Sequence, residues 1–295
     1  MPLRSFLLFA AICLVWALNM VVSQLVVDDL AVPPLVYAAL RSGVGCLVLL
    51  PWLRPIPRSL LKVVAVTFAT SGGSFALLFM GLRTTSPSAA SIIGLSSAPL
   101  TVLLAILILG ERVRWRRALG IALTFAGVLV AVANPAGWNA GEGVLLVFAA
   151  AIVGALGAVF LKQLEVEPLR LQAWGTLASV AVLLPLSLLL EEAPITASLD
   201  AGWELAAALL FSGLVVSVGA HTLYFRMLQR YDANVVAPLT LMTPVFTIAL
   251  GATISGDAVG AQLLVGGAIA AAGVLVILLR PSRELFKPLL VRPRL

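Results

Sequence analysis

Residues 98–135 of the chain, APLTVLLAILILGERVRWRRALGIALTFAGVLVAVANP, correspond closely to residues 243–281, TPVFTIALGATISGDAVGAQLLVGGAIAAAGVLVILLRP. Pro99 matches Pro244 near the start of the two segments, and both segments end on a proline. A glycine followed by an acidic residue and the letters GVLV occur in the same order in both. Scattered leucine and valine matches would arise by chance between apolar segments. Prolines and glycines in the same order indicate a duplicated unit.

The chain around this repeat is apolar along almost its whole length. Of its 295 residues, 61% are hydrophobic and 11% are charged, and the mean hydropathy is +1.12. A soluble domain is about 45–50% apolar and about 25% charged, so the composition argues against a soluble enzyme or a nucleic-acid-binding protein. A transmembrane helix needs about 20 mostly apolar residues. The runs that fit are Phe6–Val27, Leu35–Leu53, Leu61–Leu82, Ala89–Leu109, Ala118–Ala133, Val144–Leu164, Leu171–Leu190, Trp203–Leu228, Asn234–Ile254 and Ala261–Leu279.

The charged residues between these runs predict the orientation in the membrane. Basic residues close to membrane spans mark the cytoplasmic side. With the N-terminus placed inside, 17 of the 19 Lys and Arg residues fall on the inner side. The outer gaps then carry mainly acidic residues, such as Asp28, Asp29, Glu191 and Glu192. We therefore predict ten spans with both termini in the cytoplasm.

Ten spans divide into two halves of five, and an odd number of spans inverts the second half relative to the first. The charges agree, because the turn after Leu109 carries four arginines while the turn after Ser255 carries only Asp257. Inverted repeats about an axis in the membrane plane are a transporter architecture. The prediction is an all-α integral membrane protein with a first five-helix repeat at 1–135, an inverted second repeat at 136–281 and a basic cytoplasmic tail at 282–295.

Several short motifs, in a fixed order, carry a resemblance to a known family. They are Trp16 with Asn19, Pro33-Pro34 followed by Arg41, Ser96-Ser97-Ala98-Pro99, Gly110-Glu111-Arg112, and Gly120 with Gly127. In their order and spacing the chain resembles the drug/metabolite transporter superfamily, and within it the ten-helix EamA-like exporters. It departs from the family pattern at Gly256-Asp257, where Gly-Glu is usual, and at Gly154-Ala155-Leu156, where many members have a tryptophan.

The resemblance implies a function as well as a fold. The family moves small metabolites, often outward from the bacterial cytoplasm, and its best-known ten-helix members export amino acids and other metabolites. It implies a multi-pass protein of a bacterial inner membrane whose partners are a small solute, most specifically an amino acid, and the lipid bilayer. We expect alternating access through a central cavity.

The site is expected on polar and aromatic helix faces near the middle of the membrane, where inverted-repeat carriers bind their solutes. Each candidate has a structural alternative, because serine and threonine often bond their own backbone or a neighbouring helix and single aromatic rings pack or anchor at the interface. The predicted cavity-lining residues are Trp16, Asn19, Ser71, Phe75, Phe79, Ser97, Trp174, Ser217, His221, Tyr224, Thr240 and Thr243.

Pro99 and Pro244 occupy matching places in the two halves. Proline removes a backbone donor and frees an upstream carbonyl, so we expect both to bend their helices and to shape or gate the cavity. Simple kinks in the fold are the alternative.

Two ionisable side chains are predicted to lie well inside the membrane, Arg41 and His221. Such groups are costly there and are candidates for function. Arg41 could bind a carboxylate, extend toward the outer surface or cap helix carbonyls, and we favour a structural role. His221 could carry a proton, share a hydrogen bond with the solute, or pack as a satisfied core residue.

Absences in the sequence narrow the function further. No Asp or Glu falls in the middle of a predicted span, so a proton-driven pump for cationic drugs would lack its counter-ion. No phosphate-binding Gly-x-x-x-x-Gly-Lys motif, nucleophile–base set or multi-histidine metal site is present, so we expect neither an enzyme nor a cofactor. A facilitative carrier is the simplest mechanism. The alternatives are a multidrug or other small-solute exporter coupled to protons, and a scaffold.

Small residues mark two faces of the repeated segment. Gly120 and Gly127 in one copy, and Gly266, Ala270 and Gly273 in the other, allow backbones to approach closely. We predict that these two helices pack against each other beside the axis that relates the halves. A homodimer through the same faces is the alternative.

Overall fold

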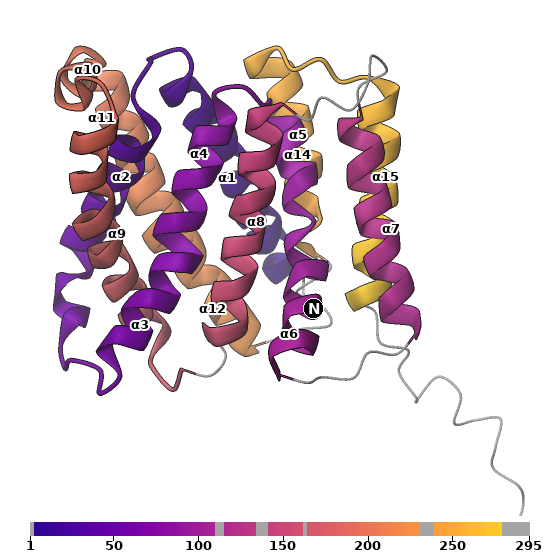
Figure 1. The fold of residues 1–295 in the computed structure, drawn as a ribbon, viewed down its shortest axis with the longest axis horizontal. Coiled ribbons are helices and arrows are strands. Elements are labelled where there is room, and N and C mark those ends of the chain that lie inside the picture. Colours follow the sequence, from indigo (N-terminus) through magenta and orange to yellow (C-terminus); the bar gives the residue numbers. More distant parts are fainter. Residues whose placement is uncertain (1–2, 110–114, 134–140, 162–163, 231–238, 279–295) are drawn as a thin grey trace, which may run out of the picture.

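The computed structural model describes residues 3–109, 115–133, 141–161, 164–230 and 239–278, and within these ranges it is helical, without β-strands. The helices run side by side, upright in Figure 1. They are α1 (Leu3–Val27), α2 (Pro34–Leu49), η1 (Leu50–Leu53), α3 (Leu60–Thr67), η2 (Phe68–Gly73), α4 (Ser74–Leu82), α5 (Pro87–Gly94), α6 (Ser97–Leu109), α7 (Trp115–Val132), α8 (Glu142–Leu161), α9 (Pro168–Leu190), α10 (Pro194–Asp200), α11 (Gly202–Leu210), η3 (Phe211–Ala220), α12 (His221–Arg230), α14 (Met242–Leu250), η4 (Gly251–Ser255) and α15 (Ala261–Leu278).

Seven helical stretches in the described ranges are long and apolar enough to cross a membrane. Several join consecutive elements, as Leu60–Leu82 joins α3, η2 and α4. Three shorter apolar helices, Ala118–Val132, Met242–Ser255 and Ala261–Ile277, accompany them. The helical membrane fold predicted from the apolar runs is therefore confirmed. One difference is α10, a short helix in a segment that the sequence analysis treated as a plain connection; Pro194 at its first position suits a helix start.

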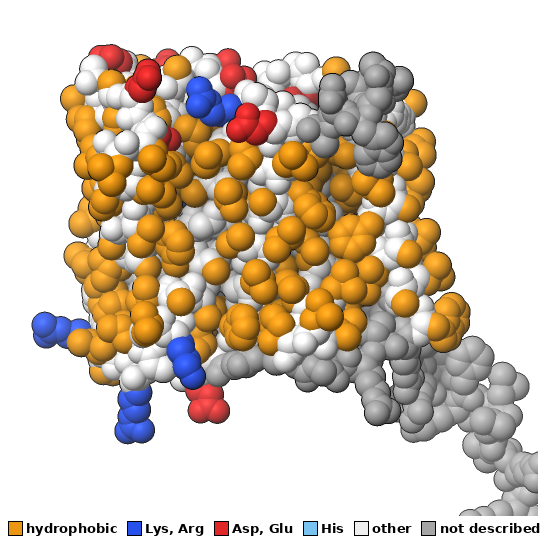
Figure 2. All heavy atoms as spheres, viewed as in Figure 1, with side chains coloured by type: hydrophobic (Ala, Val, Ile, Leu, Met, Phe, Trp, Pro, Cys, Tyr) orange, Lys and Arg blue, Asp and Glu red, His pale blue; other side chains and the backbone are white. Residues whose placement is uncertain are grey.

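The surface follows the same organisation. A broad band of hydrophobic side chains crosses the face in Figure 2, with acidic side chains mainly along its upper edge and basic ones mainly along its lower edge. The amino end of the chain lies in the lower half of the view in Figure 1. The predicted basic tail at 282–295, the boundary at 135–136 and the Gly110-Glu111-Arg112 motif lie outside the described residues.

The closest helix packing joins α7 and α15, which lie side by side in Figure 1. A Cβ atom on Gly120 would lie 2.8 Å from the backbone oxygen of Gly273, and one on Gly127 would lie 2.7 Å from the Cα of Ala270. Because real Cβ atoms do not approach so closely, only glycine fits at these crossings. Thr124 bridges the two backbones, since its Oγ1 lies 2.9 Å from the Gly120 oxygen and 3.5 Å from that of Ala270. We call this contact the glycine seam.

The seam is the packing that the small-residue faces predicted. Ala270 is fully buried in it, and the faces of both helices are covered by each other within one chain. A homodimer of this chain would therefore have to use a different surface.

Two carboxylates hold the starts of helices that begin with proline. Glu191, after α9, accepts hydrogen bonds from the backbone N–H groups of Leu35 (2.7 Å) and Val36 (3.0 Å) in α2. Asp257, after η4, accepts from the backbone N–H of Ser88 in α5 at 2.9 Å and also from its hydroxyl. The first N–H groups of a helix have no partner inside the helix, and a negative charge there is favourable. These contacts tie helix starts to segments more than 150 residues away in the sequence.

Candidate solute cavity

A cavity of about 330 Å³ lies between helices from both halves of the chain. This volume is at the lower end of the range of about 300–1,000 Å³ that small-molecule sites occupy. Its wall mixes aliphatic and aromatic side chains with hydroxyl groups, and none of the described residues that line it is charged. The lining residues are Trp16 and Met20 of α1, Ser74, Phe75 and Leu78 of α4, Ala90, Ser91 and Gly94 of α5, Leu95, Ser97 of α6, Val147, Ala150 and Ala151 of α8, and Thr240, Thr243 and Pro244.

Interrupted helices form part of this wall. The helix that begins at Pro87 stops at Gly94 and resumes at Ser97, with i→i+3 bonds at the break such as Ser96 N–H to the Ile93 oxygen, 2.9 Å. Turn residues 240 and 241 precede the start of α14 in the same way. Each break lies three or four residues before a proline, where proline frees carbonyl groups. Irregular backbone inside a membrane protein is tolerated where it lines a cavity.

Two stretches of wide π-helical turns occupy equivalent positions in the repeat. The stretch η2 covers residues 68–73 and η3 covers residues 211–220, so the repeat offset superimposes them. Wide turns of this kind are rare and often mark functional sites. The helical turn after η2 carries Phe75, and η3 carries Ser217 with His221 directly after it.

An aromatic cluster stands at one side of the cavity. The ring of Trp16 lies 5.5 Å from that of His221 and 5.1 Å from that of Tyr224, measured between centroids. Phe9 extends the cluster, at 6.1 Å from Tyr224. His221 Nδ1 is 2.9 Å from the backbone oxygen of Val216, so that nitrogen is the protonated one in the neutral ring. The cluster presents aromatic faces and edges to whatever enters beside Trp16.

Among the polar atoms on α1 that have no hydrogen-bond partner in the described residues, two lie on or next to the cavity wall. They are Nε1 of Trp16, on the cavity wall, and Oδ1 of Asn19, one turn further along the helix. Asn19 is only 4% exposed. A buried polar group without a partner is costly, so a donor and an acceptor are left for a polar ligand or for water.

Arg41 lies behind the cavity wall. Its Cζ sits 4.0 Å from the centre of the Phe75 ring and 5.6 Å from that of Phe79. Its Nη2 donates to the hydroxyl of Ser217 at 3.1 Å, and its Nε donates to the backbone oxygen of Ser212 at 3.4 Å. These bonds join α2 to η3.

The predicted site residues fall into three groups. Trp16, Phe75, Ser97, Thr240, Thr243 and Pro244 line the cavity. Asn19, Phe79, Pro99, His221 and Tyr224 lie on the same helices or contact the lining residues, and Ser217 contacts Arg41 behind the wall, but none of the six lines it. Ser71, in η2, and Trp174, in α9, are not brought to the cavity.

Sequence reasoning also missed part of the wall. Ser74 lines it and donates to the backbone oxygen of Ala150 at 3.0 Å, and Ser91 donates to the oxygen of Ser88 at 2.8 Å. The small residues of α8, Val147, Ala150 and Ala151, carry no chemical signal that would have singled them out.

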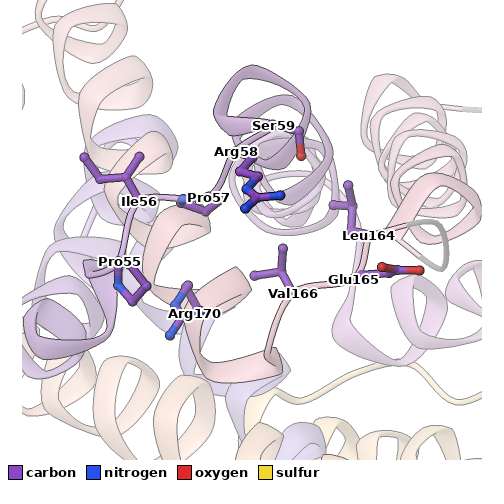
Figure 3. A pocket seen from close by; sticks show the side chains of 9 residues that line it. All are labelled: Pro55, Ile56, Pro57, Arg58, Ser59, Leu164, Glu165, Val166 and Arg170. Atoms are coloured by element: carbon purple, nitrogen blue, oxygen red, sulfur yellow. The ribbon is translucent and has the colours of Figure 1, made fainter.

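A second pocket, of about 460 Å³, lies at the edge of the molecule, outside the helix-lined centre. Figure 3 shows Arg58, from the segment before α3, and Arg170, from the first turn of α9, on its wall together with Glu165. Arg170 is within ion-pair distance of Glu167, at 3.8 Å. Loop residues of both charges form this pocket, whereas the central cavity lies where interrupted helices meet, so we take the central one as the candidate site.

Comparisons with known proteins agree with this geometry. The model of the EamA-like transporter family matches residues 3–133 and again residues 141–279. A Salmonella typhimurium protein named probable amino-acid metabolite efflux pump is 32% identical over 280 residues, which cover 90% of this chain and 91% of that protein. An Escherichia coli protein of the same name is 28% identical over the same shares of both chains.

A protein of known crystal structure has the same fold. It superimposes with a TM-score of 0.62, covers 98% of this chain and 99% of its own, and is 22% identical in sequence.

Proposed function

The chain belongs to the EamA-like transporter family, within the drug/metabolite transporter superfamily, and from this premise we propose that it exports amino acids through its central cavity by alternating access. It is a multi-pass protein of the bacterial inner membrane, with apolar spanning helices and bacterial relatives. The observation that carries the proposal is the 330 Å³ cavity, walled by interrupted helices with hydroxyl and aromatic side chains. Two relatives named as amino-acid metabolite efflux pumps support the choice of solute.

The architecture that we propose is ten spans in two inverted halves, 1–135 and 136–281, with both termini in the cytoplasm. Three kinds of observation support it. The family model matches twice along the chain. The paired π-helical stretches and the paired helix breaks lie at equivalent positions of the repeat. The separation of acidic and basic side chains onto opposite edges supports the orientation.

Alternating access needs parts that hold together and parts that bend. The glycine seam between α7 and α15 suits the first role, because its backbones touch and leave no space for movement. The breaks before Pro99 and Pro244 suit the second, because i→i+3 bonds replace part of the regular helical pattern there and proline removes a backbone donor. The proposed movement opens the cavity first to one side and then to the other.

The binding chemistry that we propose suits a zwitterion. Hydroxyl groups of Ser97, Thr240 and Thr243, and the indole of Trp16, can hydrogen-bond the ends of an amino acid. Its side chain would lie against Phe75 and Leu78. Because no acidic residue lines the cavity in the part of the chain that the structure describes, we propose facilitative transport without an obligatory proton site.

The test is counterflow in proteoliposomes. Vesicles that contain the purified protein are loaded with unlabelled amino acids, and uptake of a labelled amino acid is measured without any ion gradient. We expect uptake that Trp16→Ala or Tyr224→Ala reduces about tenfold or more, the loss of about 1.4 kcal/mol of binding free energy. Leu189→Ala, at an 80% exposed position on the outer face of α9, is the matched control and should transport like the wild type.

A second candidate function is tested in the same vesicles. A multidrug exporter coupled to protons through His221 would accumulate cationic dyes when a pH gradient is imposed. Dye export under a gradient, with no amino-acid counterflow, would contradict the amino-acid proposal and favour this second function.

A further inference from the structure

Arg41 is a charged side chain buried without a counter-ion. It is 4% exposed within the span Pro34–Leu53. Its contacts include the rings of Phe75 and Phe79, the hydroxyl of Ser217 and the backbone oxygen of Ser212. The side chains of Tyr37 and His221 are also close enough to interact with its charge. No carboxylate of the described ranges lies within ion-pair distance of it, since the ion pair found there joins Arg170 and Glu167.

The contacts that Arg41 makes do not account for its charge. A guanidinium carries five N–H donors, and the two bonds observed use Nε and Nη2 alone. Both acceptors are neutral, and a neutral donor would serve equally well to join α2 to η3. A buried, unpaired charge inside a membrane is expensive, and such groups mark function by default. Within the described part of the chain, Arg41 is therefore a cation without an anionic partner.

The position of Arg41 connects it to the cavity at two points. The Phe75 ring lines the cavity, and Arg41 Cζ lies 4.0 Å from the centre of that ring. Ser217, the hydrogen-bond partner of Arg41, lies four residues before His221, whose ring contacts Trp16 on the cavity wall. One aromatic side chain thus stands between the guanidinium and the space where a solute would bind.

We propose that Phe75 is a movable cover and that Arg41 is the group that binds the carboxylate of the transported solute. When the Phe75 ring turns away, the guanidinium faces the cavity and forms charge-assisted hydrogen bonds with the carboxylate, which are stronger than neutral ones. When no solute is present, the ring shields the charge by a cation–π contact. The chain would then select solutes that carry a carboxylate. This inference rests on the proposed function, because it takes the cavity as the solute site.

The test compares acids with matched compounds that lack the carboxylate. The full-length protein in lipid nanodiscs is titrated with L-leucine, L-phenylalanine and L-threonine and with the corresponding amino alcohols, and binding is followed by tryptophan fluorescence. In the wild type we expect at least one acid to bind about tenfold or more tightly than its alcohol, as a charge-assisted bond implies. In Arg41→Gln the two should bind within about twofold of each other.

Further variants separate a binding role from a structural one. Arg41→Lys keeps the charge and should keep the preference for the acid. Phe75→Leu removes the aromatic cover and should also keep the preference, while Arg83→Gln, at an exposed helix end, is the control for loss of an arginine. If Arg41→Gln does not fold, the ratio of acid affinity to alcohol affinity is measured in the wild type and in Arg41→Lys. A wild-type ratio near one, or a preference for the acid that is lost in Arg41→Lys, then contradicts the proposal.

The outcomes that overturn the inference are distinct from those that overturn the function. Equal binding of acid and alcohol by the wild type, or an unchanged ratio in Arg41→Gln, contradicts the role of Arg41 and leaves an amino-acid carrier intact. Absence of binding by every acid and alcohol contradicts both this inference and the amino-acid proposal.

Discussion

The glycine seam and the cavity wall differ in how closely their helices pack, although both lie where helices of the two halves meet. In the seam, the backbones of α7 and α15 touch at Gly120, Gly127 and Gly273, and no side chain larger than hydrogen fits. At the cavity, Gly94 has no atom within 4 Å of the position that its Cβ would take, and interrupted helices leave space. The same residue type therefore serves tight packing in one region and open volume in the other.

This difference shows how one repeated unit can provide both a stable helix contact and a solute cavity. The seam uses the periodic small residues of the repeated segment, which the two copies share. The cavity uses residues that differ between the copies, such as Leu95, four residues before Pro99, where the other copy has Thr240, four residues before Pro244. We infer that the symmetric part supplies stability and the asymmetric part supplies solute recognition. The predictions below test this division, from the largest effect to the smallest.

The largest effect on stability is expected when a methyl group is added to a glycine of the seam, compared with the same change at the cavity. Gly127→Ala should lower the free energy of unfolding by about 1–3 kcal/mol, because the new Cβ overlaps the backbone of Ala270. Gly94→Ala, its matched control, should leave stability unchanged. Thermal unfolding in detergent measures both. Equal stability of the two variants would contradict the rigid seam.

The next effect concerns two tryptophans. Trp16→Ala should reduce transport about tenfold, because the indole lines the cavity and packs on His221 and Tyr224. Trp203, 77% exposed at the start of α11, is the comparison, and Trp203→Ala should transport normally. Counterflow rates per folded protein measure the difference. A similar loss in both variants would show that the cavity wall has no special role.

A smaller effect is expected at the helix caps, which we infer stabilise the fold without binding solute. Glu191→Gln should cost about 1 kcal/mol of stability, as lost caps do, because the carboxylate accepts from two backbone N–H groups of α2 and from Ser187. Glu192→Gln, at the exposed neighbouring position, should change nothing measurable. Denaturation midpoints measure the change in stability. The KM of transport should be the same in both variants. A raised KM in Glu191→Gln alone would contradict this prediction, because it would show that Glu191 contributes to the solute site and not only to stability.

The smallest effect is expected from a hydroxyl on the wall. Ser74→Ala removes the bond to the Ala150 oxygen and should lower stability by about 0.5–1.5 kcal/mol. Its transport rate should fall by less than about threefold. Ser198→Ala in α10, which loses a comparable bond to the Pro194 oxygen away from the cavity, is the control for transport. A transport loss as large as that of Trp16→Ala would mean that Ser74 binds solute directly.

Much of the fold could be predicted from the sequence, because its cause is visible there. Apolar runs of membrane length predict spanning helices, and the repeated glycines predict the contact of α7 with α15. The short helix α10 could not be predicted because its seven residues mix apolar and polar types and lie in a connection, where composition does not distinguish a helix from a turn.

The site was harder to predict for a physical reason. Polarity inside an apolar helix is a signal, so Trp16, Ser97, Thr240 and Thr243 could be singled out, and they line the cavity. The wall contributed by Ala150 and Ala151 depends on shape alone, which a sequence does not display. The π-helical turns of η2 and η3 also left no signature, because they depend on how whole helices pack. Solute binding by these residues stays a prediction.

The central claim, that the cavity opens alternately to the two sides of the membrane, is tested most directly by the accessibility of a single thiol. In a background with Cys13 and Cys46 replaced by alanine, Ser97→Cys places the thiol on the cavity wall and Thr124→Cys places it in the fully buried seam. Each variant is treated with a membrane-impermeant maleimide in right-side-out and in inside-out vesicles. The account predicts that Ser97→Cys reacts from both sides and Thr124→Cys from neither. Reaction of Ser97→Cys from one side only, whichever amino acid is added, would contradict alternating access through this cavity.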